Sequence, residues 1–278
     1  MRTRQVAGTE VSAIGLGAMM FGFVDATNDA ASVRTLHACF DAGVTLVDTA
    51  LCYTSAEEPQ HGERVLAEAI ASWSGSEIKV ATKGGHYREG DGFPKDGRPE
   101  SIKAHCERSL QQLGVESLWL YYLHWPDPEV PIAESMGAFA ELQAEGKVQH
   151  VGVSNVDVAQ LREAQSVVPV AAVQNAFSLL DQSDRPVLDV CTAEGIGYLP
   201  YSPLGGYVKS REFAQHAPQA AVLADRYDVS PQQIGVAWIL AQGATVVPLV
   251  GATQSGSIVA SAAATSLDLS ADDLQLLC

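Results

Sequence analysis

The sequence predicts a single-domain α/β protein, a (β/α)8 TIM barrel over residues 1–278 with a short N-terminal hairpin. Two observations predict this class: short apolar, strand-like runs alternate about eight times with longer amphipathic stretches, and no linker or low-complexity segment divides the chain. A doubly wound open sheet is the competing architecture. The turn at Gly15-Leu16-Gly17 carries only two glycines of a dinucleotide-binding fingerprint, so the barrel is favoured.

The strands follow from apolar runs bounded by turn residues. A hairpin is expected where Gln5-Val6 and Glu10-Val11 flank the turn Ala7-Gly8-Thr9. Eight barrel strands are then expected at 13–17, 44–48, 78–82, 118–123, 148–153, 172–174, 197–200 and 245–249.

Helices are expected between these strands because capping and stop signals punctuate the amphipathic stretches. One helix starts at Asn28-Asp29 and ends at Ala42-Gly43, and another starts at Pro99 and ends at Leu113-Gly114. Three more are expected from Pro131 to Glu145-Gly146, from Ser230-Pro231 to Gln242-Gly243, and over 271–277 behind Ser270.

The charge balance narrows the class of partner. Seventeen basic residues stand against 33 acidic ones, a net charge of −16, which disfavours nucleic acid and membrane surfaces and leaves a small molecule as the expected partner. The apolar runs are shorter than the ~18 residues of a membrane span, and no apolar signal segment follows the basic N-terminus, so a cytoplasmic monomer or small homo-oligomer is expected. The five scattered cysteines form no CxxC pair, which predicts free thiols and no metal site.

Four polar residues mark one rim of the predicted barrel. Asp48, Lys83 and His124 lie at the ends of three consecutive strands, and Tyr53 follows five residues after Asp48. Catalytic residues of such barrels come from the C-terminal ends of the strands. Each residue alone has an ordinary interpretation: a loop cap, a surface lysine, a structural histidine, a rim aromatic. Their joint occurrence on neighbouring strand ends favours a catalytic site.

These residue types suit proton donation to a carbonyl oxygen. A free tyrosine titrates near ~10, and a nearby ammonium favours the phenolate, so Lys83 is expected to lower the pKa of Tyr53. Asp48 would hold Lys83 charged and in place. His124 would donate a hydrogen bond that orients the carbonyl. Such a group protonates an oxyanion as it forms, which hydride reduction of a carbonyl requires.

At this point the sequence resembles the aldo-keto reductase family over nearly its whole length. The motifs are Gly15-Leu16-Gly17, Asp48-Thr49-Ala50 with Tyr53, Ala81-Thr82-Lys83, Leu123-His124-Trp125-Pro126, Gly146-Lys147, Gly152-Val153-Ser154-Asn155, Gln174-Asn175 and Tyr201-Ser202-Pro203-Leu204. The resemblance implies a barrel that binds NADP(H) at its C-terminal rim. It also implies a catalytic tetrad of Asp48, Tyr53, Lys83 and His124, with Tyr53 as the general acid in reduction and the general base in oxidation.

The resemblance implies cofactor contacts as well. Ser154, Asn155 and Gln174 match contacts to the nicotinamide carboxamide, and Tyr201 matches the aromatic residue that stacks on the ring. The full set of expected cofactor-binding residues is Gly17, Ala18, Met19, Asp48, Ser154, Asn155, Gln174, Tyr201, Ser202, Pro203, Leu204, Gly205, Gly251, Thr253, Ser257 and Ser261. The loops after the seventh and eighth strands are where barrels commonly bind phosphate.

The sequence departs from the family after Gly251. Where relatives carry basic residues for the ribose 2′-phosphate, and a Glu-Asn pair for adenine, this chain has Thr253, Ser257, Ala260 and Ser261. Hydroxyl groups bond a phosphate without neutralising it. NADP(H) is therefore the expected cofactor, with NAD(H) also open.

The substrate is expected to be an aldehyde, ketone or sugar, and the sequence does not choose among them. Expected wall residues are Met19, Phe21, Tyr53, His86, Tyr87, Trp125 and Tyr207, and the long segment 86–98 is expected to cover the site. Two other functions stay open: a Schiff-base aldolase that uses Lys83, and a non-catalytic regulatory subunit that binds the cofactor. The Gln174 and Tyr201 matches argue against the first, and the complete tetrad argues against the second.

Overall fold

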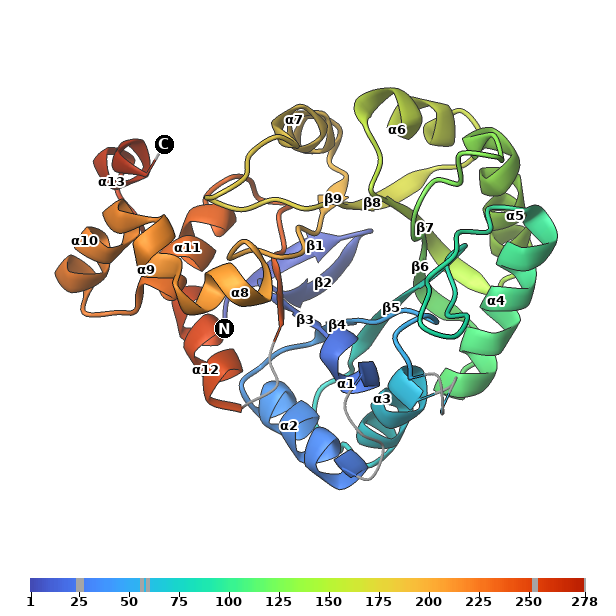
Figure 1. The fold of residues 1–278 in the computed structure, drawn as a ribbon, viewed down its shortest axis with the longest axis horizontal. Coiled ribbons are helices and arrows are strands. Elements are labelled where there is room, and N and C mark those ends of the chain that lie inside the picture. The colour runs from blue at the N-terminus through green and yellow to red at the C-terminus, as the bar shows by residue number, and fades with distance from the viewer. Residues whose placement is uncertain (24–27, 56–57, 59–60, 252–254, 278) are drawn as a thin grey trace.

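A computed structural model describes residues 1–278 except 24–27, 56–57, 59–60, 252–254 and 278. Its centre is an eight-stranded parallel sheet in the order β10-β3-β4-β5-β6-β7-β8-β9, which curls with helices on its outside (Figure 1). The strands are β3 (Gly15–Gly17), β4 (Leu46–Asp48), β5 (Lys79–Gly84), β6 (Leu118–Leu123), β7 (Val148–Ser154), β8 (Val170–Gln174), β9 (Gly197–Tyr198) and β10 (Leu249–Gly251).

The two ends of the sheet are joined by backbone hydrogen bonds, which make it a barrel. Val246 forms a parallel bridge with Tyr198, and the amides of Val247 and Leu249 donate to the carbonyls of Tyr198 and Pro200, both at 2.9 Å. The barrel expected from the sequence is therefore confirmed, and the open doubly wound sheet is excluded. The eighth strand lies later than expected, at Leu249–Gly251, because most of 245–249 reaches β9 only through this irregular pairing.

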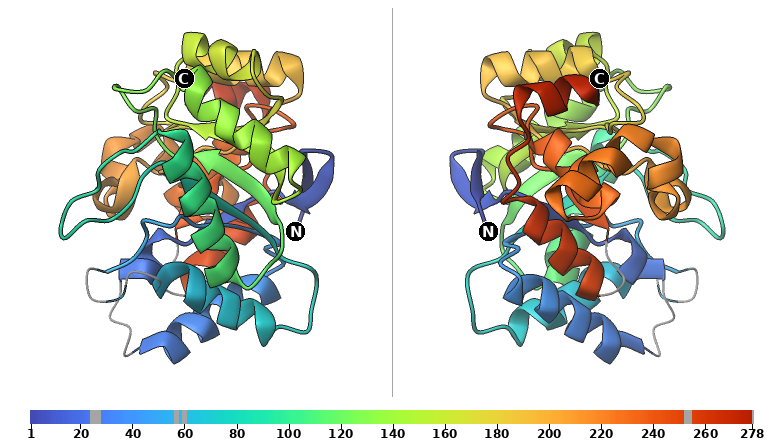
Figure 2. Two further views of the ribbon diagram at one scale, coloured as in Figure 1. Left: turned by 90° about the vertical axis from the view of Figure 1, so that its right-hand side faces the viewer. Right: turned by 90° about the vertical axis from the view of Figure 1, so that its left-hand side faces the viewer.

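The expected hairpin is present as β1 (Thr3–Val6) and β2 (Thr9–Ser12). Its turn is one residue shorter than predicted: Ala7 and Gly8 take φ values of 53° and 72°, and Thr9 already pairs with Val6. A two-residue turn with positive φ at both positions matches the twist of the two strands. The hairpin lies on the side of the barrel opposite the long loop that follows β5 (Figure 2), and Val6 and Val11 pack among the inward side chains of the barrel.

The helices cover the outside of the barrel. They are α1 (Met19–Phe23), α2 (Asp29–Asp41), α3 (His61–Ala71), α4 (Pro99–Leu113), α5 (Ile132–Ala144), α6 (Val158–Gln165), α7 (Arg185–Glu194), α8 (Gly206–Arg211), α9 (Phe213–His216), α10 (Pro218–Tyr227), α11 (Pro231–Leu240), α12 (Ser255–Ala264) and α13 (Ala271–Leu276). No helix in the described part of the chain is long and apolar enough to cross a bilayer.

Several helix ends confirm the capping signals in the sequence. Ser230 caps α11 and Ser270 caps α13, each through a reciprocal capping box with the residue three positions later. Gly114 ends α4 in the left-handed conformation, at φ 67°. Pro131 departs from expectation slightly, because it is the residue before α5 rather than its first residue. Cys39, Cys52, Cys106 and Cys191 are buried free thiols, and Cys278 lies outside the described residues.

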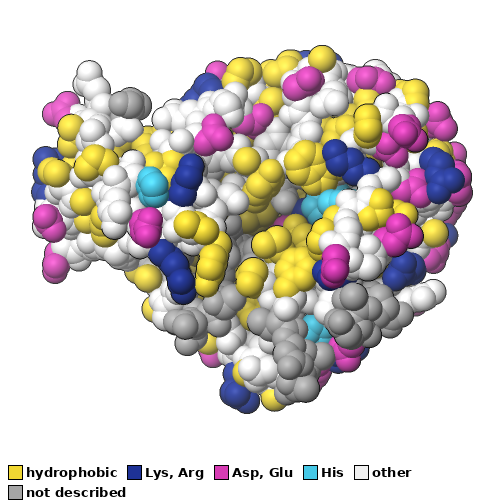
Figure 3. Space-filling model, viewed as in Figure 1, with side chains coloured by type: hydrophobic (Ala, Val, Ile, Leu, Met, Phe, Trp, Pro, Cys, Tyr) yellow, Lys and Arg dark blue, Asp and Glu magenta, His cyan; other side chains and the backbone are white. Residues whose placement is uncertain are grey.

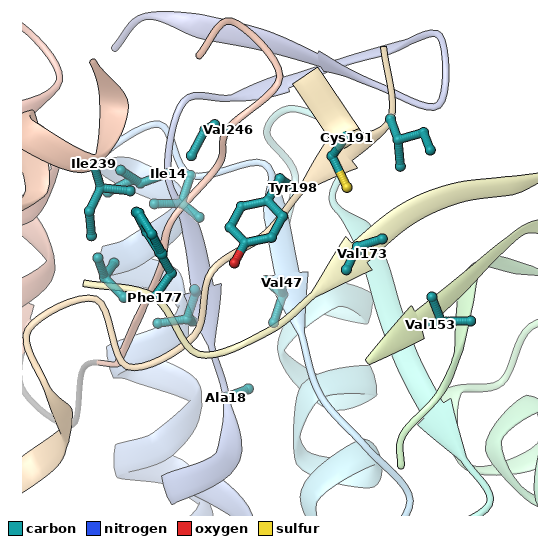
Figure 4. Close-up of a cluster of buried hydrophobic side chains, with 14 of the residues drawn as sticks. Ile14, Ala18, Val47, Val153, Val173, Phe177, Cys191, Tyr198, Ile239 and Val246 are labelled. Atoms are coloured by element: carbon teal, nitrogen blue, oxygen red, sulfur yellow. The ribbon is translucent and has the colours of Figure 1, made fainter. Parts of the chain in front are cut away.

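Two apolar layers hold the barrel together, and alternation along each strand separates them. Val47, Val153 and Val173 face outward into the core between barrel and helices, where Phe177 and Tyr198 also pack (Figure 4). Leu46, Ala81 and Leu120, with others of the same strand face, fill the barrel interior. The inward face continues toward the C-terminal ends of the strands, where its side chains become polar.

Candidate active site

The same alternation places four predicted polar residues at the mouth of the barrel. Leu46, Ala81, Tyr122 and Ala172 point into the barrel interior from four different strands. The residue two positions further along each of these segments points the same way, and these residues are Asp48, Lys83, His124 and Gln174 respectively. All four side chains are buried. The face of the molecule seen in Figure 3 is hollowed near its centre, and histidine side chains lie in the hollow among hydrophobic ones. Period-two alternation thus brings residues far apart in the sequence into one site.

Lys83 is the centre of the hydrogen-bond network. Its Nζ donates to Asp48 Oδ1 at 2.5 Å, to the Thr49 carbonyl at 2.8 Å and to the Tyr53 hydroxyl at 3.3 Å. The other carboxylate oxygen of Asp48 accepts from Gln174 Nε2 at 2.8 Å. An ammonium group has three donors, so Lys83 is fully bonded and its position is fixed.

Burial and ion pairing set the charge states of this group. Burial lowers the pKa of Lys83, but attraction to the Asp48 carboxylate and to Tyr53 outweighs that effect, so the pKa stays above its usual value. Burial raises the pKa of Tyr53 to about 12, and Lys83 opposes the rise only in part. The expectation that Lys83 brings the pKa of Tyr53 below its ordinary value is therefore wrong for the protein alone. Tyr53 is a protonated phenol at neutral pH, which is the form a proton donor needs.

His124 faces Tyr53 across the mouth. The two rings meet edge to face with centroids 5.7 Å apart. Burial, together with the neighbouring Lys83 and His86, holds the pKa of His124 well below its usual range. The ring is thus neutral at neutral pH and carries one N–H, which suits it to donate a single directed hydrogen bond.

Small residues allow the Tyr53 backbone to approach its neighbours closely. An ideal Cβ on Gly22 would lie 1.9 Å from the Tyr53 carbonyl oxygen, and one on Gly62 would lie 2.2 Å from it. Contacts this short with backbone atoms force the chain to move. The α1 and α3 helices therefore fix the position of the loop that carries the phenol.

The residues expected to contact a nicotinamide form a connected polar strip beside the tetrad. Ser154 Oγ donates to the Gln174 carbonyl at 2.6 Å, Asn155 Nδ2 donates to the His124 carbonyl at 3.0 Å, and the Tyr201 hydroxyl donates to Asn155 Oδ1 at 2.7 Å. Asn155 has a φ of 59°, a conformation that asparagine tolerates better than most residues. These contacts fix the amides and the half-buried Tyr201 ring before any ligand arrives.

This donor set fits a flat ring that bears a carboxamide. Gln174 donates one N–H to Asp48, and its side-chain amide also carries a second N–H and an acceptor oxygen. The half-buried Tyr201 ring offers an aromatic surface beside them. At the neighbouring strand end, the Ala18 amide donates to the Asp48 carbonyl at 2.8 Å, which ties the segment Gly17 to Met19 to the same rim.

The structure places the remaining expected cofactor residues in two loops and a helix. Pro203 is buried, Leu204 and Gly205 are half-buried, and Ser202 is exposed, before α8. Gly251 ends β10, and Ser257 and Ser261 lie on α12, exposed and half-buried respectively. Thr253 lies outside the described residues.

The expected substrate-wall residues differ in their placement. Phe21 lies in the buried core at 4% exposure, whereas its neighbour Phe23 packs against Tyr53 with ring centroids 6.3 Å apart. The ring of Phe93, from the β5–α4 loop, meets the Phe23 ring edge to face, with the ring centroids 6.0 Å apart. Sequence reasoning missed both Phe23 and Phe93. The aromatic spacing Phe21, Phe23 in a short helix gave no signal of which ring faces the mouth.

The other wall candidates also differ in what they contact. The ring centroids of His86 and His124 are 4.9 Å apart. The Lys95 ammonium lies over the Trp125 ring, 4.5 Å from its centroid. Tyr87 turns toward His105, with centroids 5.7 Å apart. Tyr207 on α8 is 64% exposed. The β5–α4 loop folds back on itself through an antiparallel bridge between His86 and Lys95.

Fold and site together define a TIM-barrel protein with a lysine–carboxylate–tyrosine group at its C-terminal rim. The family model described as "Aldo/keto reductase family" matches residues 13–277. The chain belongs to the aldo/keto reductase family and is an oxidoreductase of that family.

Sequence relatives and solved structures agree with this assignment. A probable aldo-keto reductase 1 of Glycine max is 31% identical over 96% of this chain and 85% of its own, and an uncharacterized oxidoreductase of Schizosaccharomyces pombe is 30% identical over 97% and 87%. The glycerol dehydrogenase of Gluconobacter oxydans superposes with a TM-score of 0.89 at 26% identity, covering 99% of this chain and 93% of that one. An aldo/keto reductase of Klebsiella pneumoniae in complex with NADP and acetate has a TM-score of 0.84 at 26% identity, with the same coverage.

Proposed function

We propose that this protein reduces the carbonyl group of an aldehyde, ketone or sugar with NAD(P)H, and that Tyr53 supplies the proton. The proposal rests on the arrangement of four side chains at the barrel mouth. The Tyr53 hydroxyl lies 3.3 Å from Lys83 Nζ, and Lys83 Nζ lies 2.5 Å from Asp48 Oδ1. The neutral His124 ring faces the Tyr53 ring, with the ring centroids 5.7 Å apart. A donor, its charged partner and an orienting imidazole thus border one opening. This is the arrangement that protonation of a developing oxyanion needs.

The protein residues have separate roles in this reaction. The bound nicotinamide cofactor supplies the hydride. Tyr53 gives its phenolic proton to the carbonyl oxygen, and the Lys83 ammonium stabilises the resulting phenolate. Asp48 keeps Lys83 charged and in place, and the N–H of His124 orients the carbonyl oxygen toward Tyr53. In the reverse direction the Tyr53 phenolate accepts the alcohol proton.

The polar strip beside the tetrad supports a nicotinamide cofactor. Ser154, Asn155 and Gln174 would hold the carboxamide, and Tyr201 would support the ring. The α12 segment, SGSIVASAAA, contains no lysine or arginine, so this helix itself offers no cationic side chain to a 2′-phosphate. We infer an unusually small preference for NADPH over NADH. The solved relative that contains NADP supports a nicotinamide cofactor without deciding between the two.

The alternative of a Schiff-base aldolase is disfavoured by the state of its required nucleophile. Lys83 is fully buried, ion-paired with Asp48 and kept charged. A Schiff-base lysine must lose its proton before it can attack a carbonyl. Borohydride treatment with an aldehyde or ketone is therefore expected to leave Lys83 unmodified.

Nucleotide titration followed by a turnover assay tests the proposal. The fluorescence of NADPH and of NADH is expected to change on binding to the wild-type protein, and addition of a simple aldehyde is expected to consume the reduced nucleotide. Binding without turnover across aldehydes, ketones and sugars would instead favour the non-catalytic regulatory subunit. Absence of binding to either nucleotide would overturn the proposal.

A further inference from the structure

Three potential metal ligands meet at the barrel mouth although the mechanism above uses only one of them. Cys52, His86 and His124 come from the loops after the neighbouring strands β4, β5 and β6. One ligand atom from each lies within 4.8 Å of the others. The scattered cysteines gave no sign of this cluster, because its members are 34 and 38 residues apart in the chain.

The Cys52–His124 pair already has the spacing of a metal site. Cys52 Sγ lies 3.5 Å from His124 Nδ1. With metal–sulfur and metal–nitrogen bonds of about 2.3 and 2.0 Å, two ligands of a tetrahedral zinc ion lie about 3.5 Å apart. The third ligand atom, at up to 4.8 Å, needs to move by about 1 Å, which a half-buried loop side chain such as His86 allows.

The hydrogen bonding of His86 leaves a nitrogen for the metal. Its Nε2 lies 2.6 Å from the Phe93 carbonyl, so Nε2 carries the proton and donates it there. The other nitrogen, Nδ1, is buried and has no hydrogen-bond partner among the described residues. A histidine that donates one N–H to a backbone carbonyl while its second nitrogen points to a metal is the usual arrangement in metal sites. The lone pair of Nδ1 is otherwise unused.

We propose that Cys52, His86 and His124 bind one thiophilic divalent ion of the Zn²⁺ type, with a fourth coordination position open to the barrel mouth. The donor set of one sulfur and two imidazoles is typical of Zn²⁺ and disfavours Mg²⁺ and Ca²⁺, which prefer oxygen. On binding, the Cys52 thiol proton passes to solvent as the sulfur–metal bond forms, and no electron is transferred.

Occupation of this site would inhibit the enzyme. A metal bound to His124 would take a nitrogen lone pair, fix the ring and add a positive charge next to Tyr53. The proposed reaction orients the carbonyl between His124 and Tyr53. Zn²⁺ would therefore compete with the carbonyl substrate and leave nucleotide binding nearly unchanged. This consequence rests on the proposed reductase function, whereas metal binding itself does not.

Metal binding is tested directly by titrating the folded, reduced protein with Zn²⁺ and, separately, Co²⁺. The wild type is expected to take up one ion per chain, and bound Co²⁺ is expected to show thiolate-to-metal charge-transfer absorption. Cys52→Ser removes the sulfur ligand and is expected to weaken Zn²⁺ binding at least tenfold and abolish that absorption. Cys191→Ala removes another buried free thiol, outside the barrel mouth, and is expected to match the wild type.

Three outcomes would overturn the proposal: no stoichiometric uptake, unchanged affinity in Cys52→Ser, or equal loss in Cys191→Ala. Inhibition is measured as the ratio of rates with and without Zn²⁺ within each variant, so that an effect on basal rate cancels. Wild type and Cys191→Ala are expected to lose activity competitively with the aldehyde, and Cys52→Ser is expected to resist. Uptake of one ion by a protein without turnover would retain the metal site and reject the reductase function.

Discussion

Glu63 on α3 is a buried carboxyl group whose removal is expected to change the pH dependence of stability. It is 1% exposed, and Thr82 donates to its Oε1 at 2.6 Å, while Oε2 has no hydrogen-bond partner among the described residues. Burial raises its pKa to about 7, and the bond from Thr82 opposes the rise. The folded protein therefore binds this proton more tightly than the unfolded chain does.

The sign and size of the effect follow from proton linkage. A pKa of 4.5 in the unfolded chain and about 7 in the folded protein corresponds to about 3 kcal/mol, at about 1.36 kcal/mol per pH unit. This stabilisation is fully present below pH 4.5 and is lost as the pH rises through 7. Glu63→Gln keeps an acceptor for Thr82 and carries no charge at any pH, so its stability relative to the wild type is expected to rise over that window.

The assay is urea unfolding of both proteins at a series of pH values from 4.5 to 8.5, with the free energy of unfolding compared at each pH. The difference between Glu63→Gln and the wild type is expected to grow by up to about 3 kcal/mol in favour of the variant. Glu68→Gln, an exposed position on the same helix, is the control and is expected to stay within about 0.5 kcal/mol of the wild type at every pH. A difference for Glu63→Gln that does not change with pH would refute the reasoning.

Three further substitutions test the site. Lys83→Met is expected to lower the rate of carbonyl reduction at least a hundredfold while the dissociation constant of NADPH, measured by fluorescence, changes little; a rate near wild type would contradict the role of Lys83. Ser257→Arg is expected to raise the preference for NADPH over NADH by roughly 5- to 30-fold at one fixed salt concentration, and an unchanged ratio would show that α12 does not face the 2′-phosphate. Gly22→Ala is expected to displace the Tyr53 loop and lower the rate of carbonyl reduction at least tenfold. Gly137→Ala is the control and is expected to leave that rate unchanged, because a Cβ there meets no atom within 4 Å. Equal effects of the two substitutions would refute the steric argument.

The strand pattern predicted most of the fold because it depends on local signals. β6 lies at the expected residues, 118–123, and the next strand toward the N-terminus, β5, overlaps its predicted range, since continuous apolar runs mark buried parallel strands. The eighth strand was misplaced because the segment before Leu249 meets β9 through isolated bonds only, an arrangement set by barrel closure. The hairpin turn was one residue too long because nothing local indicated a positive φ at Ala7.

The candidate site could be predicted where strand ends specify it and not where loops do. Asp48, Lys83 and His124 follow from alternation along strands, and the structure brings them to one mouth with Tyr53. The direction of the Tyr53 pKa was wrong because desolvation depends on packing that a sequence does not reveal. The approach of Cys52 and His86 to His124 was missed for a related reason, since it depends on how two loops fold over the barrel.

Tyr53→Phe tests the central claim most directly, because it removes one hydroxyl group and keeps the ring. Two quantities are measured on the variant and the wild type: the single-turnover rate of aldehyde reduction and the dissociation constant of NADPH. Reduction is expected to fall to less than a hundredth of the wild-type rate, while nucleotide affinity is expected to stay nearly unchanged. A variant that keeps more than a tenth of the rate, a loss below about 1.4 kcal/mol in the barrier, would contradict the assignment of Tyr53 as the proton donor.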